Sequence, residues 1–397
     1  MANWYVNGTT GNDGIASAAD YALTSATKTV TKVGAFTTAY TYHAGDQIQV
    51  VTTGVLGHAV VGFYTIASKT NDTLVLTTDP TDGTNETGVT IVVGNDGTAA
   101  ATSVGSLAGP YKTIATAIAA AATGDTINIA AATYSENGLS GMAKALTFTG
   151  ADRTTTIISS TDTGIVIDSN SSVYDMTITG TLYGIRVGTN AAARSNIIVS
   201  NCALTGTTEE GFYYSGTSTG ITNLLIENCT LDGANTGCLA GYIKGGTIRN
   251  CTMTKNTAYA DSIHDLSALA IGGACAVENC TLTFSNNDAA QDDYVAGIII
   301  LGATIGTTRI RNCTISVTQL SAGCTGDVCG VYGANLGKVD VSNCTLTVTN
   351  ANTGADTTYD FYNAGTAKIT AANVKYNPSR IYGTFLNITP LRRNRPS

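Results

Sequence analysis

The chain has 397 residues, of which 43% are hydrophobic and only 12% charged, and its formal net charge is −8. This hydrophobic share supports a long core, and the negative net charge disfavours nucleic acid as a partner, because phosphate is repelled. Glycine is abundant (44) and proline scarce (5), and Thr, Val, Ile and Tyr are frequent, which favours an all-β protein with many turns.

The first segment, residues 1–22, opens with MANWYVNG and has neither a basic n-region nor an apolar h-region. We therefore expect no secretory signal. No stretch of the chain approaches 18 apolar residues, so we expect no membrane insertion. Such a protein either stays in the cytoplasm where it is made or leaves by another route, such as cell lysis.

An insertion at residues 23–93 contains three short apolar runs, Gly45–Val50, Gly62–Ile66 and Thr73–Leu76. Their alternation and the Gly and Asn-Asp turns between them indicate strands. We expect a small antiparallel β-barrel or sandwich here, followed by a linker at residues 94–108.

Residues 113–122 are the clearest helix of the sequence. Thr113 is a suitable N-cap, and Ile114, Ala117 and Ile118 share one apolar face. An alternating strand follows at Gly124–Ile129. A short amphipathic helix in this place would cover the open end of a solenoid core, which needs a cap to stay soluble.

Several strings around this helix resemble the opening of pectate-lyase-like right-handed parallel β-helix proteins. They are Gly109–Ile129, Ala132–Glu136 and Phe148–Ile158, together with Trp4–Gly8 and Gly11–Gly14. The resemblance covers about 280 residues at the level of the fold and about 50 residues at the level of recognisable sequence motifs. It implies a single right-handed β-helix, with which the usual hand of parallel crossovers agrees. Members of this kind occur as bacteriophage virion proteins.

A repeated phrase marks the solenoid, which we place at residues 109–376. Six Asn-Cys pairs recur with steps of 22 to 33 residues, a period typical of solenoids. They are Asn201-Cys202, Asn228-Cys229, Asn250-Cys251, Asn279-Cys280, Asn312-Cys313 and Asn343-Cys344. The pattern predicts about eight or nine coils and a shaft roughly 40 Å long at the usual strand spacing.

Each Asn-Cys pair follows alternating apolar residues, so we expect the chain to bend at the Asn. Asn tolerates the left-handed backbone conformation and can bond to the Asn of the next coil, forming a ladder. The Cys is then a small buried apolar residue, reduced and stacked inside the coil. Neither C-x-x-C pairs nor His partners accompany these cysteines, which disfavours zinc.

A second phrase precedes each pair, as in Gly164–Ile167, Gly211–Tyr214 and Gly297–Ile300. Each coil therefore carries at least two strands. Tyrosine is frequent (19). Tyr213, Tyr214 and Tyr242 suit ordinary strand packing, and the alternative is a ladder of exposed tyrosines that stacks on sugars.

Catalytic motifs of the resembled polysaccharide lyases and hydrolases are absent as a set, so no catalytic residue and no cofactor is assigned. The best polar cluster is an acidic loop region that also contains His264. Its carboxylates, a candidate Ca²⁺ site, are Asp261, Asp265, Asp288, Asp292 and Asp293. The alternative is that these residues are solvated and keep a sheet protein soluble.

The last segment, residues 377–397, is predicted to cap the far end of the solenoid, with Pro378 and Pro390 stopping strand growth. Its tail carries Arg392, Arg393 and Arg395. These arginines are either solvated or dock on an acidic partner.

Three functions fit these features. The first is a structural protein of a bacteriophage particle, such as a capsid decoration, head fibre or tail-associated spike, that contacts host-surface glycans. In it, residues 23–93 and the C-terminal tail would bind other virion proteins, and the shaft could form a homotrimer. The alternatives are a polysaccharide lyase or hydrolase and a bacterial surface adhesin. The sequence leans towards a protein that is not an enzyme.

Overall fold

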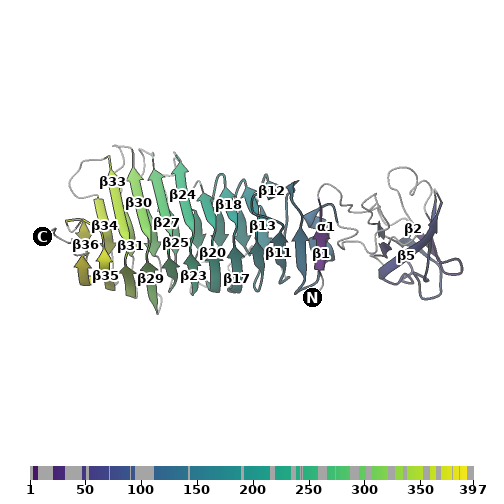
Figure 1. Ribbon diagram of the computed structural model, residues 1–397. Coiled ribbons are helices and arrows are strands. Elements are labelled where there is room, and N and C mark those ends of the chain that lie inside the picture. Colours follow the sequence, from purple (N-terminus) through teal and green to yellow (C-terminus); the bar gives the residue numbers. More distant parts are fainter. Residues whose placement is uncertain are drawn as a thin grey trace. The chain divides into compact units, whose positions relative to one another are not determined.

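The computed structural model groups the chain into two compact units. The first comprises Met1–Tyr134 with Leu146–Thr156, and the second comprises Ser135–Ala145 with Ile157–Ser397. Figure 1 labels many of their helices and strands. The structure describes residues 3–7, 21–31, 47–50, 53–70, 72–89, 91–93, 111–141, 144–188, 192–214, 220–233, 238–241, 243, 245–257, 266–272, 274–286, 295–300, 306–320, 327–333, 338–351, 358–363, 368–377, 379–383 and 385–390.

A seven-stranded antiparallel sheet forms the insert in the first unit. In sheet order its strands are β7 (Glu86–Val89), β2 (Tyr21–Thr24), β3 (Thr29–Thr31), β6 (Thr73–Leu76), β5 (Gly62–Lys69), β4 (Gln47–Val50) and β8 (Ile91–Val93). The edge strands β7 and β8 are one residue apart in the sequence, so the sheet curls until its two edges lie close, as in a small barrel. Its core includes Tyr21, Leu23 and Leu74. The module begins at Tyr21, two residues before the predicted boundary.

The first unit also holds the opening strands and the predicted helix. They are β1 (Asn3–Val6), α1 (Ile114–Ala120), β9 (Thr126–Ile129), β10 (Ala132–Ser135) and β11 (Thr147–Gly150). Strands β1 and β11 both pair with β9 in parallel. Thr113 caps α1, because its side chain accepts a hydrogen bond from the Thr116 amide at 3.3 Å. The helix buries Ile114, Ala117 and Ile118 and ends two residues before the predicted end.

Three parallel sheets make up the second unit. The first contains β14 (Ser172–Tyr174), β17 (Arg194–Ser200), β20 (Ile221–Glu227), β23 (Gly246–Arg249), β26 (Ala276–Glu278), β29 (Thr307–Arg311), β32 (Lys338–Ser342), β35 (Lys368–Val374) and β37 (Phe385–Pro390). The second contains β12 (Thr156–Ser160), β15 (Thr177–Gly180), β18 (Ala203–Gly206), β21 (Thr230–Gly233), β24 (Thr252–Thr257), β27 (Thr281–Asn286), β30 (Thr314–Gln319) and β33 (Thr345–Asn350). The third contains β13 (Ile165–Ile167), β16 (Ile185–Val187), β19 (Phe212–Tyr214), β22 (Leu239–Gly241), β25 (Leu266–Ile271), β28 (Val295–Ile300), β31 (Val328–Gly333), β34 (Thr358–Asn363) and β36 (Ile381–Tyr382).

Each coil thus contributes one strand to each sheet, which is the arrangement of a right-handed parallel β-helix and confirms the predicted fold. The coil has three strands where the sequence established only two, because the bend at the Asn-Cys pair splits one apolar phrase between two sheets. The last strands, β36 and β37, extend past residue 376, the predicted end of the solenoid.

The connections between sheets differ in regularity. From β14 to β33, two residues join each strand of the first sheet to the next strand of the second, as between Glu227 and Thr230 or between Glu278 and Thr281. The connections from the second sheet to the third vary, with four residues between Gly180 and Ile185 but eight between Asn286 and Val295. One corner is therefore fixed and another is free to change in length.

The fixed corner is a bend of left-handed residues. The residue that begins it has φ between 52° and 57° in successive coils: Asp175, Asn201, Asn228, Asn250, Asn279, Asn312, Asn343 and Asn373. Side-chain amides link these rungs. Asn279 donates to Asn250 at 3.2 Å, and Asn312 donates to Asn279 at 3.1 Å. The six asparagines that the sequence singled out all lie at these bends.

A second, shorter amide ladder was not evident in the sequence. Asn170, Asn196 and Asn223 also have positive φ, of 58°, 55° and 54°. Asn196 donates to Asn170 at 2.7 Å, and Asn223 donates to Asn196 at 3.0 Å. Asn196 and Asn223 lie near the starts of β17 and β20, whereas Asn201 and Asn228 follow the ends of the same strands, so the two ladders brace these strands at both ends.

Alternating burial builds the core inside the coil. One row on the second sheet stacks large apolar side chains in register, each with a relative exposure of 5% or less: Ile178, Leu204, Leu231, Met253, Leu282, Ile315 and Leu346. Burying each such side chain contributes about 1.5–3 kcal/mol. Every second residue of these strands therefore belongs to the core, and the residues between face outward.

Prediction on the ladder. Asn279→Ala should lower the free energy of unfolding by about 2–3 kcal/mol, because it removes two amide hydrogen bonds and leaves a Cβ residue in the left-handed region without a local bond. Asn279→Gly keeps the backbone geometry and should lose about 1 kcal/mol less. Urea denaturation followed by circular dichroism measures both. Equal losses for the two variants would contradict a role for the left-handed bend.

Candidate functional site

The acidic residues that the sequence offered as a Ca²⁺ site lie outside the described residues. These are Asp261, Asp265, Asp288, Asp292 and Asp293, with His264. The tail arginines and Tyr242 also lie outside them. In the part of the chain that the structure describes, no three His, Cys, Asp or Glu side chains converge as a metal site. That part also has no helix that is long and apolar enough to cross a membrane.

A ladder of tyrosines lies on the outer side of the third sheet, at the C-terminal end of the solenoid. Register places Tyr332 of β31 beside Tyr362 of β34, and Tyr362 beside Tyr382 of β36. The ring centroids of Tyr332 and Tyr362 are 5.4 Å apart with planes 20° apart, and those of Tyr362 and Tyr382 are 4.7 Å apart with planes 13° apart. The rings therefore stack face to face along the coil direction.

Tyr359 and Asp327 complete this group, which we call the tyrosine platform. The Tyr359 ring meets Tyr362 edge-on at 5.0 Å and lies 5.7 Å from Tyr382. Burial raises the pKa of Asp327, while a hydrogen bond with Tyr362 opposes that rise. Tyr382 is 50% exposed, whereas Tyr332 is 6% exposed. The platform thus runs from a buried end to an open one.

Small apolar residues support the buried end. Ala296, Ile299 and Cys329 form a buried cluster with Tyr332, separate from the core inside the coil, and Tyr359 and Tyr362 pack against it. Register aligns Ile299 with Tyr332 and Ala296 with Cys329. Packing on this cluster restricts the rings, so the platform is a rigid surface.

A second aromatic group lies nearer the start of the solenoid on the same sheet. The rings of Tyr183 and Tyr213 are 4.4 Å apart and almost parallel, at 7°, and the Arg186 guanidinium lies 5.7 Å from the centre of the Tyr183 ring. Tyr214, the next residue along, points the other way: it is 2% exposed and its hydroxyl donates to the Ala192 carbonyl at 2.9 Å. Of these two tyrosines, only Tyr213 belongs to the outer face.

Glu210 lies beside this second group and is 2% exposed. Burial and the charge of Glu209 raise the pKa of Glu210 to about 8, against the opposing charge of Lys255. Burial and then the charge of Glu210 raise the pKa of Tyr213. A carboxyl with such a pKa is mostly protonated at neutral pH and can donate a proton. No sequence pattern points to Glu210, because a Glu-Glu pair in a turn is common.

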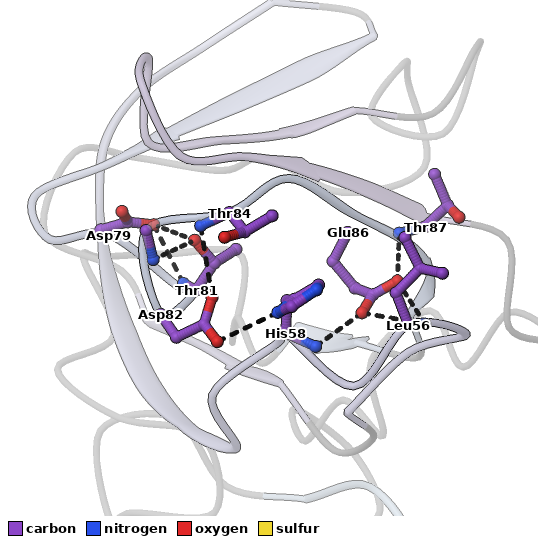
Figure 2. Close-up of polar contacts among 9 residues, drawn as sticks. Leu56, His58, Asp79, Thr81, Asp82, Thr84, Glu86 and Thr87 are labelled. Carbon is purple, nitrogen blue, oxygen red and sulfur yellow. Dashed lines mark hydrogen bonds and ion pairs between the residues drawn. The ribbon is translucent and has the colours of Figure 1, made fainter.

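The barrel of the first unit carries a third candidate, an anchored loop at residues 53–61 (Figure 2). The Glu86 carboxylate accepts hydrogen bonds from the amides of Leu56 and His58, the latter at 2.7 Å, and from the Thr87 amide at 2.7 Å. These bonds hold the pKa of Glu86 at about 2, against burial, which alone would raise it. The His58 ring faces Asp82 at 3.0 Å, and that hydrogen bond raises the pKa of His58.

The anchored loop exposes apolar side chains. Val55 is 74% exposed, Leu56 65%, Val60 46% and Val61 51%. Gly54 has a φ of +80°, and a Cβ there would lie 2.3 Å from the Glu86 side chain. The loop is therefore held in one shape by a buried carboxylate while it presents apolar groups to solvent.

Comparisons with known proteins find similar chains among solved structures. No family model and no curated protein matches the chain. Among solved structures, similar ones include a pectin methylesterase from carrot, with 17% identity over 65% of this chain and 85% of that one and a TM-score of 0.38. A pectate lyase has 15% identity over 73% and 76% of the two chains, with a TM-score of 0.41. An alginate lyase from Paenibacillus has 12% identity over 68% and 95%, with a TM-score of 0.35.

Prediction on Glu210. Its raised pKa means that the folded state keeps the carboxyl neutral while the unfolded state ionises it near the ordinary value of 4.5. The protein should therefore lose stability as the pH rises from about 4.5 to about 8. Glu210→Gln removes this loss, so the variant should equal the wild type at acidic pH and exceed it above pH 8. Thermal melts across this range measure the difference; parallel curves for the two proteins would contradict the assignment.

Proposed function

We propose that this chain is a structural protein that contacts a polysaccharide through the tyrosine platform, and that it does so as part of a bacteriophage particle. The observation that carries the glycan contact is the stacked row of Tyr332, Tyr362 and Tyr382 on the outer side of the third sheet. Aromatic faces bury the apolar face of a sugar ring, while the tyrosine hydroxyls remain available as hydrogen-bond donors and acceptors.

Rigidity supports this proposal. The platform rings pack on buried Ala296, Ile299 and Cys329, so little conformational entropy is lost when a sugar binds. Tyr382 presents the open ring, and Asp327 supplies a carboxyl beside Tyr362. Host-surface glycans are the ligands that we propose, since repeating sugars match a surface that repeats from coil to coil.

The proposal that the chain is part of a particle rests on a difference between the surfaces of the solenoid wall and of the barrel. The solenoid wall pairs its backbone groups within its own sheets, so it offers no free strand edge along its side. The anchored loop, by contrast, presents Val55, Leu56 and Val60 on a fixed backbone. We propose that the barrel uses this loop to attach to other virion proteins, with the C-terminal tail as a further contact. A homotrimer and Ca²⁺ in the acidic loops stay predictions of the sequence.

The second candidate is a polysaccharide lyase or hydrolase, and the observation that favours it is Glu210. Acid–base cleavage of a glycosidic bond requires a carboxyl that is protonated at working pH and a second that is ionised. Glu210, with a pKa of about 8, has the properties of the first, and it lies beside the stacked rings of Tyr183 and Tyr213. Its 2% exposure requires a movement before any substrate can reach it.

Prediction on the tyrosine platform. Tyr382→Ala and Tyr362→Ala should each weaken binding to a bacterial surface polysaccharide about 5- to 30-fold, because each removes one stacking ring of about 1–2 kcal/mol. Binding to a panel of capsular and lipopolysaccharide glycans is measured by biolayer interferometry. Tyr174→Ala, at a half-buried tyrosine on the first sheet, is the matched control and should bind normally.

The chain length of the same glycans, measured after incubation with the protein, separates the two candidates. Reduction of the glycan's chain length by the wild type, lost in Glu210→Gln but retained in Tyr382→Ala, would replace the structural proposal with the enzyme. Glycan binding that survives both tyrosine substitutions would remove the platform from the proposal.

Prediction on the anchored loop. Leu56→Ser together with Val60→Ser should leave the barrel folded, because both side chains are already in solvent. The doubly substituted protein should nevertheless fail to join phage particles produced in a complementation assay, while glycan binding by the isolated protein stays unchanged. Normal occupancy in purified particles would show that another surface makes the attachment.

A further inference from the structure

A cavity of about 230 Å³ lies in the first unit, over the strands that open the solenoid. Register places Tyr5 of β1 beside Asn128 of β9, and Asn128 beside Thr149 of β11. These three side chains line the cavity and are half-buried, whereas their strand neighbours Val6 and Ile129 belong to the core. One outward row of side chains on three neighbouring strands therefore forms the cavity.

The shape of the cavity comes from side chains of unequal size. Three of its lining residues, Ala130, Gly150 and Ala151, are small, so a ligand can approach the backbone there, and Tyr5 supplies an aromatic ring. From inside the coil, the hydroxyl of buried Tyr134 donates a hydrogen bond to the Ala130 carbonyl at 3.0 Å. The backbone beneath the cavity is thus held in place before a ligand binds, which lowers the entropic cost of binding.

The amide of Asn128 is held in one orientation. Its Nδ2 donates to the Trp4 carbonyl at 3.3 Å. Trp4 is itself fixed, because its indole N–H donates to Asp125 at 3.0 Å and its ring stacks on Tyr111. The bond to Trp4 uses one of the two amide hydrogens, so Asn128 still offers one donor and its carbonyl oxygen as an acceptor. The Thr149 hydroxyl, one strand away, adds a group that both donates and accepts.

We propose that this cavity binds one uncharged sugar residue in its pyranose form. The apolar face of the sugar ring packs on Tyr5, and two neighbouring hydroxyls of the sugar bond to Asn128 and Thr149. Each sugar hydroxyl is both a donor and an acceptor, which matches what these two side chains offer. The tyrosine platform belongs to the second unit, so this cavity is a separate contact that does not depend on the platform.

Charge and size select this class of ligand. None of the nine residues that line the cavity is charged, so a carboxylate, phosphate or ammonium group would lose its hydration there without gaining a partner. The cavity volume of about 230 Å³ lies below the range of about 300–1,000 Å³ that is usual for drug-sized ligands. It therefore suits one sugar ring rather than a longer chain of sugars.

The test measures binding of methyl glycosides to the full-length protein by saturation-transfer difference NMR. The panel contains the methyl pyranosides of glucose, galactose, mannose and N-acetylglucosamine, with methyl glucuronide as the charged comparison. At least one uncharged glycoside should bind the wild type more tightly than the glucuronide does. Tyr5→Ala and Asn128→Leu should each weaken that binding about 10-fold or more, because the first removes the ring and the second removes the amide bonds.

Three further variants serve as controls. Tyr5→Phe keeps the ring and should retain binding. Tyr174→Ala removes a half-buried tyrosine outside the cavity, and Tyr362→Ala disables only the tyrosine platform, so both should bind the glycoside normally. If circular dichroism shows that Tyr5→Ala does not fold, the contrast between Asn128→Leu and Tyr5→Phe carries the test.

Three outcomes overturn the proposal. The first is a wild type that binds none of the uncharged glycosides, and the second is tighter binding of the glucuronide. The third is binding that survives both Tyr5→Ala and Asn128→Leu. If that surviving binding is lost in Tyr362→Ala, the sugar is held by the platform alone, so the outcome for this cavity is distinct from the outcome for the proposed function.

Discussion

In-register stacking is the constraint on which the second unit depends. Each strand pairs in parallel with its counterpart one coil away, so every side chain lies beside the side chain at the equivalent position of the next coil. The same residue type at equivalent positions of successive coils is therefore favourable, because like side chains then contact one another from coil to coil. The asparagine ladder, the row of buried apolar side chains on the second sheet and the tyrosine platform are three products of this one rule.

In-register stacking stabilises inward and outward side chains by different interactions. Inward positions such as Leu231 and Leu282 gain from burial, which is roughly proportional to the apolar area removed from water. Outward side chains are stabilised only by contacts with neighbouring side chains. These contacts are hydrogen bonds at the bend and ring stacking at Tyr362 and Tyr382. Ordered arrays of outward side chains therefore form where side chains of one kind follow one another from coil to coil.

Some of this could be predicted from the sequence and some could not. The repeated Asn-Cys phrase located the bends, because a left-handed residue and a small inward residue are both needed there, and the string after Thr113 located the capping helix. The third strand of each coil could not be predicted, because the apolar stretch around each Asn-Cys pair is continuous in sequence although the bend divides it between two sheets. A ladder of exposed tyrosines was one of two open alternatives, but the residues of the tyrosine platform were not singled out, because whether Tyr332 faces inward or outward depends on a register that the sequence does not state. Glu210 gave no signal, since its character comes from burial among residues distant in sequence.

The unequal corners of the coil have an evolutionary consequence. Where two residues join the first sheet to the second, from β14 to β33, an insertion would move the bend of that coil out of line with its ladder. Where four to eight residues join the second sheet to the third, an insertion alters one coil and leaves its neighbours in register. Length changes can therefore accumulate at that corner without selection against them on grounds of stability. A lineage that must track a changing surface would keep the scaffold and vary the loops beside the third sheet, where the tyrosine platform lies.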